Sequence, residues 1–134
     1  TNTSTPEPSL HITHPPTRFP SLSGNGISDE GALAIAKAMH ACSIPLQKVF
    51  LGNNLICDVG AAALANAIRP GLLRLGLGDN LIGTTGLWAV RDAAKEHLST
   101  FERCCLFGNP GLEEGTEVYF KLDELHNINL SERG

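Results

Sequence analysis

The chain has 134 residues, a length that suits one domain with a continuous core rather than several independent domains. Its formal net charge of −4 argues against nucleic acid as the main partner. The longest apolar stretch, around residues 59–65, is far too short to span a membrane, so we expect no membrane association. No signal peptide is visible, which favours a cytoplasmic protein.

The first sixteen residues differ in composition from the rest of the chain. Residues 1–16 read TNTSTPEPSLHITHPP, rich in Thr, Ser and Pro and poor in apolar side chains. Pro15 and Pro16 exclude both a helix and ladder pairing, so we expect a disordered or extended leader. The folded domain is then expected to occupy residues 17–134.

A pattern recurs four times within that domain. Residues 46–60 read LQKVFLGNNLICDVG and residues 72–86 read LLRLGLGDNLIGTTG, while 17–31 and 101–115 fit the same frame. Every unit has an asparagine followed six positions later by a glycine. The asparagines are Asn25, Asn54, Asn80 and Asn109. Their spacing of 29, 26 and 29 residues (25 to 54, 54 to 80, 80 to 109) is typical of a solenoid.

Each part of the repeat has a physical role. Apolar residues three and five places before the asparagine alternate with polar ones, which predicts a strand with one buried face. The asparagine amide can satisfy backbone groups where the chain turns inward. We therefore expect Asn54 to be structural and exposed Asn53 to tolerate alanine. The glycine allows the following helix to approach its neighbour closely.

The predicted elements follow in chain order. Strands are expected at residues 19–23, 48–52, 74–78 and 103–107. Helices are expected at residues 29–41, 58–68, 84–97 and 113–124. Ser28 or Asp29 is expected to cap the first helix, and Thr84 or Thr85 the third. Leu125, Ile128 and Leu130 repeat the strand spacing, which predicts a fifth, terminal strand.

The pattern LxxLxLxxNxL followed by a helix resembles the leucine-rich repeats of the ribonuclease-inhibitor-like class, over about residues 17–130. The resemblance implies an α/β fold: a short right-handed solenoid, or horseshoe, with a parallel sheet on the concave face and helices on the convex face. It also implies binding through the concave strands and adjoining loops. Pro20, Cys104 and Gly111 depart from the pattern, which makes the first and last full units irregular, as terminal units tend to be.

The repeat phase predicts which strand side chains face out on the concave side. They stand six, four and two places before each asparagine. The first row contains Lys48, Arg74 and Arg103, preceded by Phe19 and followed by Asn127. We predict a strip that binds an acidic, partly apolar segment of a protein partner; its residues are Lys48, Phe50, Arg74, Arg103, Cys105 and Phe107. The alternative is that these long side chains simply extend into solvent.

The four cysteines show no regular spacing. Free thiols are expected, with Cys104 in the core and Cys105 exposed beside it. A disulfide between Cys42 and Cys57 is the alternative.

No nucleophile–base pair and no metal-binding quartet occurs at matched repeat positions, so we expect no enzyme, no cofactor and no metal. The predicted function is a non-enzymatic protein–protein interaction module. One alternative is a regulator of another enzyme, of the inhibitor or GTPase-activating type. Another is a self-assembling structural protein, with homodimers formed through uncapped ends.

Overall fold

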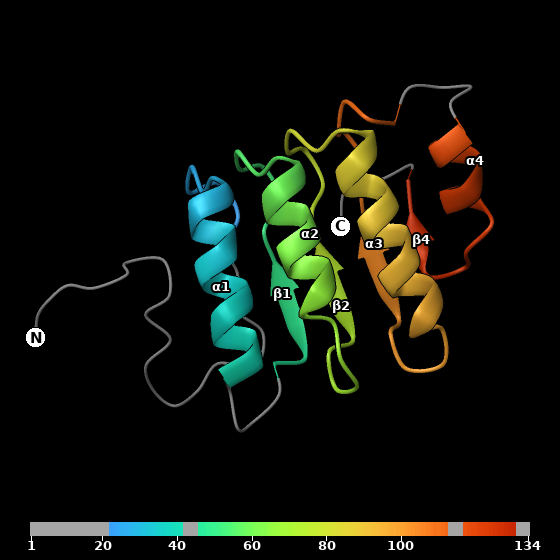
Figure 1. The fold of residues 1–134 in the computed structure, drawn as a ribbon, viewed down its shortest axis with the longest axis horizontal. Helices are drawn as coiled ribbons and strands as arrows, with labels where there is room; N and C mark the ends of the chain where they lie inside the picture. The colour runs from blue at the N-terminus through green and yellow to red at the C-terminus, as the bar shows by residue number, and fades with distance from the viewer. Residues whose placement is uncertain (1–21, 42–45, 113–116, 131–134) are drawn as a thin grey trace, which may run out of the picture.

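The computed structural model describes residues 22–41, 46–112 and 117–130. The expectations for the leader, for Phe19 and Pro20, and for Cys42 lie outside these residues. Helices and strands alternate strictly along the described chain (Figure 1). The helices are α1 (Asp29–Ala41), α2 (Asp58–Asn66), α3 (Thr84–Glu96) and α4 (Glu117–Asp123). The strands are β1 (Lys48–Phe50), β2 (Arg74–Gly76), β3 (Arg103–Cys105) and β4 (Ile128–Asn129).

The strands form a parallel sheet in sequence order, β1-β2-β3-β4. The helices lie together on one side of this sheet, with α1, α2 and α3 side by side (Figure 1). Because parallel strands need a crossover connection, one helix between each pair of neighbours gives this two-layer arrangement. The fold is therefore α/β and compatible with a leucine-rich repeat.

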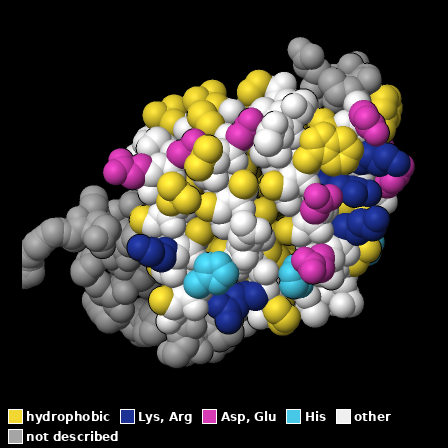
Figure 2. All heavy atoms as spheres, in the orientation of Figure 1, with side chains coloured by type: hydrophobic (Ala, Val, Ile, Leu, Met, Phe, Trp, Pro, Cys, Tyr) yellow, Lys and Arg dark blue, Asp and Glu magenta, His cyan; other side chains and the backbone are white. Residues whose placement is uncertain are grey.

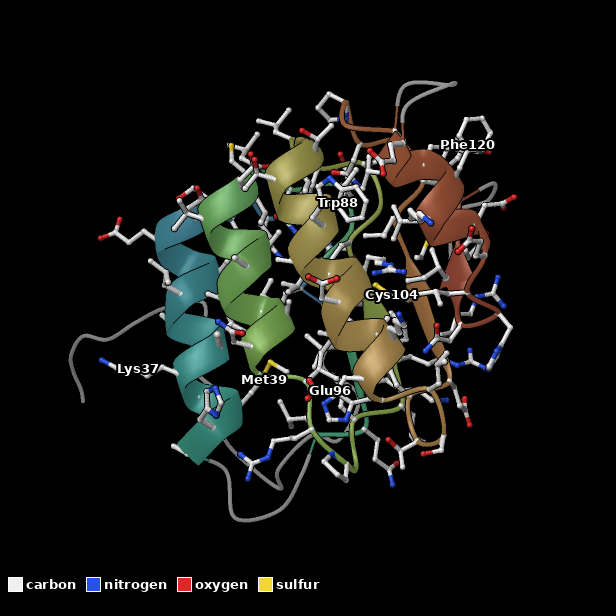
Figure 3. The ribbon with its side chains drawn as sticks, turned by 45° about the vertical axis from the view of Figure 1, so that its right-hand side comes forward. Lys37, Met39, Trp88, Glu96, Cys104 and Phe120 are labelled. Atoms are coloured by element: carbon white, nitrogen blue, oxygen red, sulfur yellow. The ribbon has the colours of Figure 1, made fainter. Side chains whose placement is uncertain are left out.

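The core lies between the two layers and is mainly aliphatic. The strand side chains that point toward the helices are fully buried, as are the small residues on the inner faces of the helices. In Figure 3, Met39 of α1 and Cys104 of β3 lie in this interior. The buried residues within the strands or directly after them include Val49, Leu51, Leu75, Leu77, Cys104 and Leu106. Alanine at the inner helix positions allows the thin layers to stack.

Three buried asparagines join successive units. Asn54 Oδ1 accepts the backbone N–H groups of Asn25 and Ile27, each at 2.9 Å. Its Nδ2 donates to the carbonyl of Leu51, also at 2.9 Å. The amides that make such bonds from one unit to the one before it belong to Asn54, Asn80 and Asn109. Buried backbone groups at each turn are satisfied in this way.

Asn25 differs from these three. Its side chain is exposed, and its amide donates to the carbonyl of Ser23 in the same turn at 3.3 Å. The structural role expected for Asn25 stays a prediction. The residues that would supply an earlier turn lie outside the described part of the chain.

A second set of hydrogen bonds runs along the helix N-termini. Asp29 Oδ1 accepts the backbone N–H groups of Cys57 at 2.7 Å and Gly60 at 3.0 Å. One unit further, Asp58 Oδ1 accepts the N–H of Gly83 at 2.6 Å. Each carboxylate thus caps the helix of the next unit, where the helix dipole favours negative charge.

Several element boundaries differ from those expected. Helix α3 begins at Thr84, and its N-cap residue is Gly83, so the expected capping by Thr84 or Thr85 is wrong. The Gly83 N–H instead donates to Asp58 Oδ1 of the preceding unit. Helix α2 ends at Asn66 because Ala67 donates to Leu64 three residues back, in a tighter turn. Strands β1, β2 and β3 have three residues rather than five, but backbone bonds between units continue beyond them.

The residue before each repeat asparagine takes the left-handed backbone conformation. Asn53 has φ of 57° and Asp79 has φ of 56°. Units one and four place glycines there, Gly24 and Gly108, with φ of 73° and 88°. Gly, Asn and Asp are the residues that tolerate this conformation best. Each unit therefore turns away from its strand with the same geometry.

Candidate functional site

The sheet has a face without helices, which we call the open face. Strand alternation places on it the side chains that do not enter the core. Lys48 pairs in register with Arg74, and Arg74 pairs with Arg103. Three cationic side chains therefore stand on successive strands, about 5 Å apart at their backbones. We call these three residues the cation row.

The cation row is partly neutralised. Arg74 Nε lies 3.3 Å from Glu102 Oε1, and the two side chains are 41% and 53% exposed. An exposed pair of this kind contributes at most about 1 kcal/mol. The Glu102 carboxylate therefore offsets part of the repulsion that Arg74 experiences from the neighbouring cations.

Beyond Arg74, the open face of β2 and of the residues that follow it has two glycines, Gly76 and Gly78, and therefore no side chains. Phe50 leans over Gly76 from β1, since a Cβ added at Gly76 would lie 3.3 Å from Phe50 Cδ1. Cys105 approaches from β3, with Sγ 3.5 Å from the corresponding position at Gly78. The aromatic ring and the thiol thus converge on the glycines from opposite sides.

This arrangement forms a hollow of about 200 Å³ on the open face. Phe50 and Cys105 form its apolar walls, and Gly76 and Gly78 form its floor. Asn53 and Asp79 border it where the strands end. The hollow and the cation row lie on the same face, side by side along the strands. We call this feature the glycine hollow.

Two predicted exposures on this face are wrong. Cys105 is only 4% exposed, because the absent side chains of the neighbouring strand let its thiol settle over Gly78. Asn127 is fully buried, and its Nδ2 donates to the carbonyls of Ala94 and Phe101, each at 3.2 Å. It therefore ties the terminal segment to the rest of the fold and does not extend the cation row. Phe107 is half-buried.

A broader depression, of about 820 Å³, lies on the helix side over α1 and α2. Its lining consists mostly of alanines, with Leu33, Lys37 and His40 among them. Figure 2 shows this face, where hydrophobic side chains occupy the upper and middle parts. Lys, Arg and His lie along its lower and right-hand margins (Figure 2). In Figure 3, Lys37 points away from α1 and from the sheet. This is the rival surface for a partner.

Other kinds of site receive no support within the described residues. No group of three or more His, Cys, Asp or Glu side chains is arranged to hold a metal ion there. None of the described helices combines the length and apolar character needed to cross a membrane. Cys57, Cys104 and Cys105 are free thiols.

The comparisons with known proteins agree with the repeat geometry. No family model matches the chain. The chain is similar to a ribonuclease inhibitor. That protein, from Mus musculus, is 26% identical over 105 residues, which are 77% of this chain. The chain spans only 23% of the length of that relative. The similarity is compatible with a leucine-rich-repeat type of fold.

Proposed function

We propose that this chain is a non-enzymatic protein-interaction module, a right-handed leucine-rich-repeat solenoid that binds its partner on the open, concave face of the sheet. The observation that carries the proposal is the cation row, formed by Lys48, Arg74 and Arg103 in register. The apolar glycine hollow lies directly beside it. Together they suit a partner segment that is acidic and partly apolar.

A fixed row of like charges is costly in a free protein, although Glu102 offsets part of that cost at Arg74. An anionic segment laid across the row would interact with all three strands at once. Affinity would then come from the apolar contact, and orientation from the charges. Phe50 is the residue placed to supply the apolar anchor.

Regulation of another enzyme is the second candidate, because the relative is named an inhibitor. The cation row argues against a ribonuclease as the target. An enzyme that binds RNA phosphates presents basic side chains to them, and like charges on the two surfaces would repel. An assay of ribonuclease activity with and without the chain separates this candidate; no inhibition is expected.

The test of the main proposal uses two charge reversals and a protein partner recovered by affinity capture with the whole chain. Arg74→Glu on the open face should weaken binding by about tenfold or more. Lys37→Glu on the outer helix is the matched control and should bind like the parent. Thermal melts check that both variants remain folded. Loss of binding for Lys37→Glu alone would mean that the partner binds on the helix side, which would contradict the proposal.

A further inference from the structure

The chemical groups on the open face change along β2. Arg74 stands at the start of β2, followed on the same face by Gly76 and then Gly78. Each step of two residues covers about 6.6 Å in an extended chain. The strand then leads into Asp79, which borders the glycine hollow. A partner segment that follows β2 would therefore meet the Arg74 guanidinium first, then backbone without side chains, and then the Asp79 carboxylate.

The dimensions of the glycine hollow limit what it can hold. About 200 Å³ is below the roughly 300–1,000 Å³ typical of small-molecule pockets. It is enough for one large apolar side chain. The Phe50 ring and the Cys105 thiol offer apolar and polarizable walls, while the glycine floor lets an incoming chain approach the sheet closely.

We infer that the glycine hollow seats one apolar side chain of an extended partner segment, and that this segment carries acidic groups only on the Arg74 side of that side chain. The inference rests on the proposed function and specifies the partner's motif. Lys48 and Arg103 flank Arg74 in register, so an acidic group two to four residues from the anchor meets the cation row.

Asp79 supplies the selectivity. A partner with acidic groups on both sides of its apolar residue must place one of them near the Asp79 carboxylate. Like charges brought together in this way reject a ligand that would otherwise fit, which is how many interfaces achieve specificity. Reversing the direction of such a ligand does not help, because its two sides are equivalent.

The probes are three synthetic nine-residue peptides with blocked ends. ESESLSQSQ carries acidic groups on one side of its leucine, and ESESLSESE carries them on both sides. ESESASQSQ replaces the leucine by alanine. Their affinities for the whole chain are measured by NMR titration, together with the shifted amides. The one-sided leucine peptide should bind about tenfold more tightly than the alanine peptide, from the apolar surface that leucine buries.

Two protein variants test the charges. Arg74→Gln should weaken the one-sided peptide by about threefold or more. Asp79→Asn introduces a residue type that unit two already uses at this left-handed position, as Asn53, so the backbone conformation is tolerated; a thermal melt checks that the variant remains folded. It should strengthen the two-sided peptide by about threefold and change the one-sided peptide by less than twofold.

Several results would overturn the inference. They are equal binding of the leucine and alanine peptides, no measurable binding by either, or a preference for the one-sided peptide that survives Asp79→Asn. The proposed function is judged separately, by the effect of Arg74→Glu on the recovered protein partner. If that effect is present while the peptides fail, only the motif is wrong. If it is absent, the open-face function fails as well.

Discussion

Asp29 in the first helix and Gly60 in the second are in direct contact across 31 residues of sequence: the Asp29 carboxylate accepts the Gly60 N–H at 3.0 Å. A Cβ added at Gly60 would lie 2.6 Å from that same oxygen and 2.9 Å from Ala32 Cβ. The glycine of the repeat is thus required by the neighbouring unit. The close approach recurs one unit later, where a Cβ added at Gly86 would lie 2.8 Å from Asp58 Oδ1.

This contact predicts non-additive mutations. Gly60→Ala should destabilise the fold by about 2 kcal/mol, although alanine is the better helix former by about 1 kcal/mol. Asp29→Ala should cost about 1 kcal/mol through the lost cap. The double variant should cost less than the sum, because the oxygen that obstructs the new methyl group is gone. Urea unfolding of the parent, the two single variants and the double variant measures the coupling between the two positions. Strictly additive losses of stability would contradict the prediction.

The turn residues predict opposite responses at adjacent asparagines. Asn54→Ala should lower the free energy of unfolding by about 3 kcal/mol, because its amide satisfies buried backbone groups in two units. Asn53→Ala should cost about 1 kcal/mol through left-handed strain, contrary to the tolerance expected from its exposure.

Asn53→Gly is the matched control and should be close to neutral, since glycine adopts this conformation without strain. Thermal or denaturant unfolding ranks the three variants. If Asn53→Ala and Asn53→Gly are equally stable, the left-handed backbone conformation is not what makes alanine unfavourable at this position.

The Cys104 thiol should resist both labelling and ionisation. Burial, and after it the neighbouring Cys105, raise the pKa of Cys104 well above its usual range. The folded chain therefore holds this proton more tightly than the unfolded chain does. Stability should fall as pH rises above the ordinary thiol pKa of about 8.5, by up to about 1.4 kcal/mol per pH unit.

Two measurements check this behaviour. Mass-mapped alkylation of the native protein should modify half-buried Cys57 well before Cys104. Cys104→Val should flatten the loss of stability between about pH 8.5 and 10. Labelling of Cys104 at the rate of Cys57 under native conditions would show that the core is open.

The two parts of the open face predict different salt responses. Binding of the recovered partner should weaken several-fold as salt rises, because exposed charges are screened beyond roughly 8–10 Å at ordinary ionic strength. Arg74→Gln should reduce this salt dependence. Phe50→Ala should lower affinity by about tenfold and leave the dependence unchanged, as expected for an apolar anchor. Binding curves at two salt concentrations measure these differences. If the affinity of the parent chain does not depend on salt, the cation row does not contribute to binding.

Much of the open face could be predicted because the repeat fixes both strand phase and register. In-phase units with a period-two alternation place Lys48, Arg74 and Arg103 side by side without further information. The same reasoning cannot reveal that Cys105 is buried. Its exposure depends on the missing side chains of the next strand, which let the thiol lean sideways.

The capping aspartates show a second limit. Asp29 stands where a cap for its own helix is expected, so the sequence alone offers a local partner. Its hydrogen-bond partners are instead the backbone N–H groups of Cys57 and Gly60 in the next unit. The sequence does contain a signal for this arrangement, because units one and two each have an aspartate four residues after the repeat asparagine. Thr84 interrupts it in unit three.

The measurement that most directly tests open-face binding is hydroxyl-radical footprinting of the chain with and without its recovered partner. Phe50 and Phe107 report on the open face, and Leu33, which is 46% exposed on α1, reports on the helix side. We predict several-fold protection of Phe50 and Phe107 in the complex, with Leu33 oxidised at its free rate. Protection of Leu33 with unchanged oxidation of Phe50 and Phe107 would contradict the account.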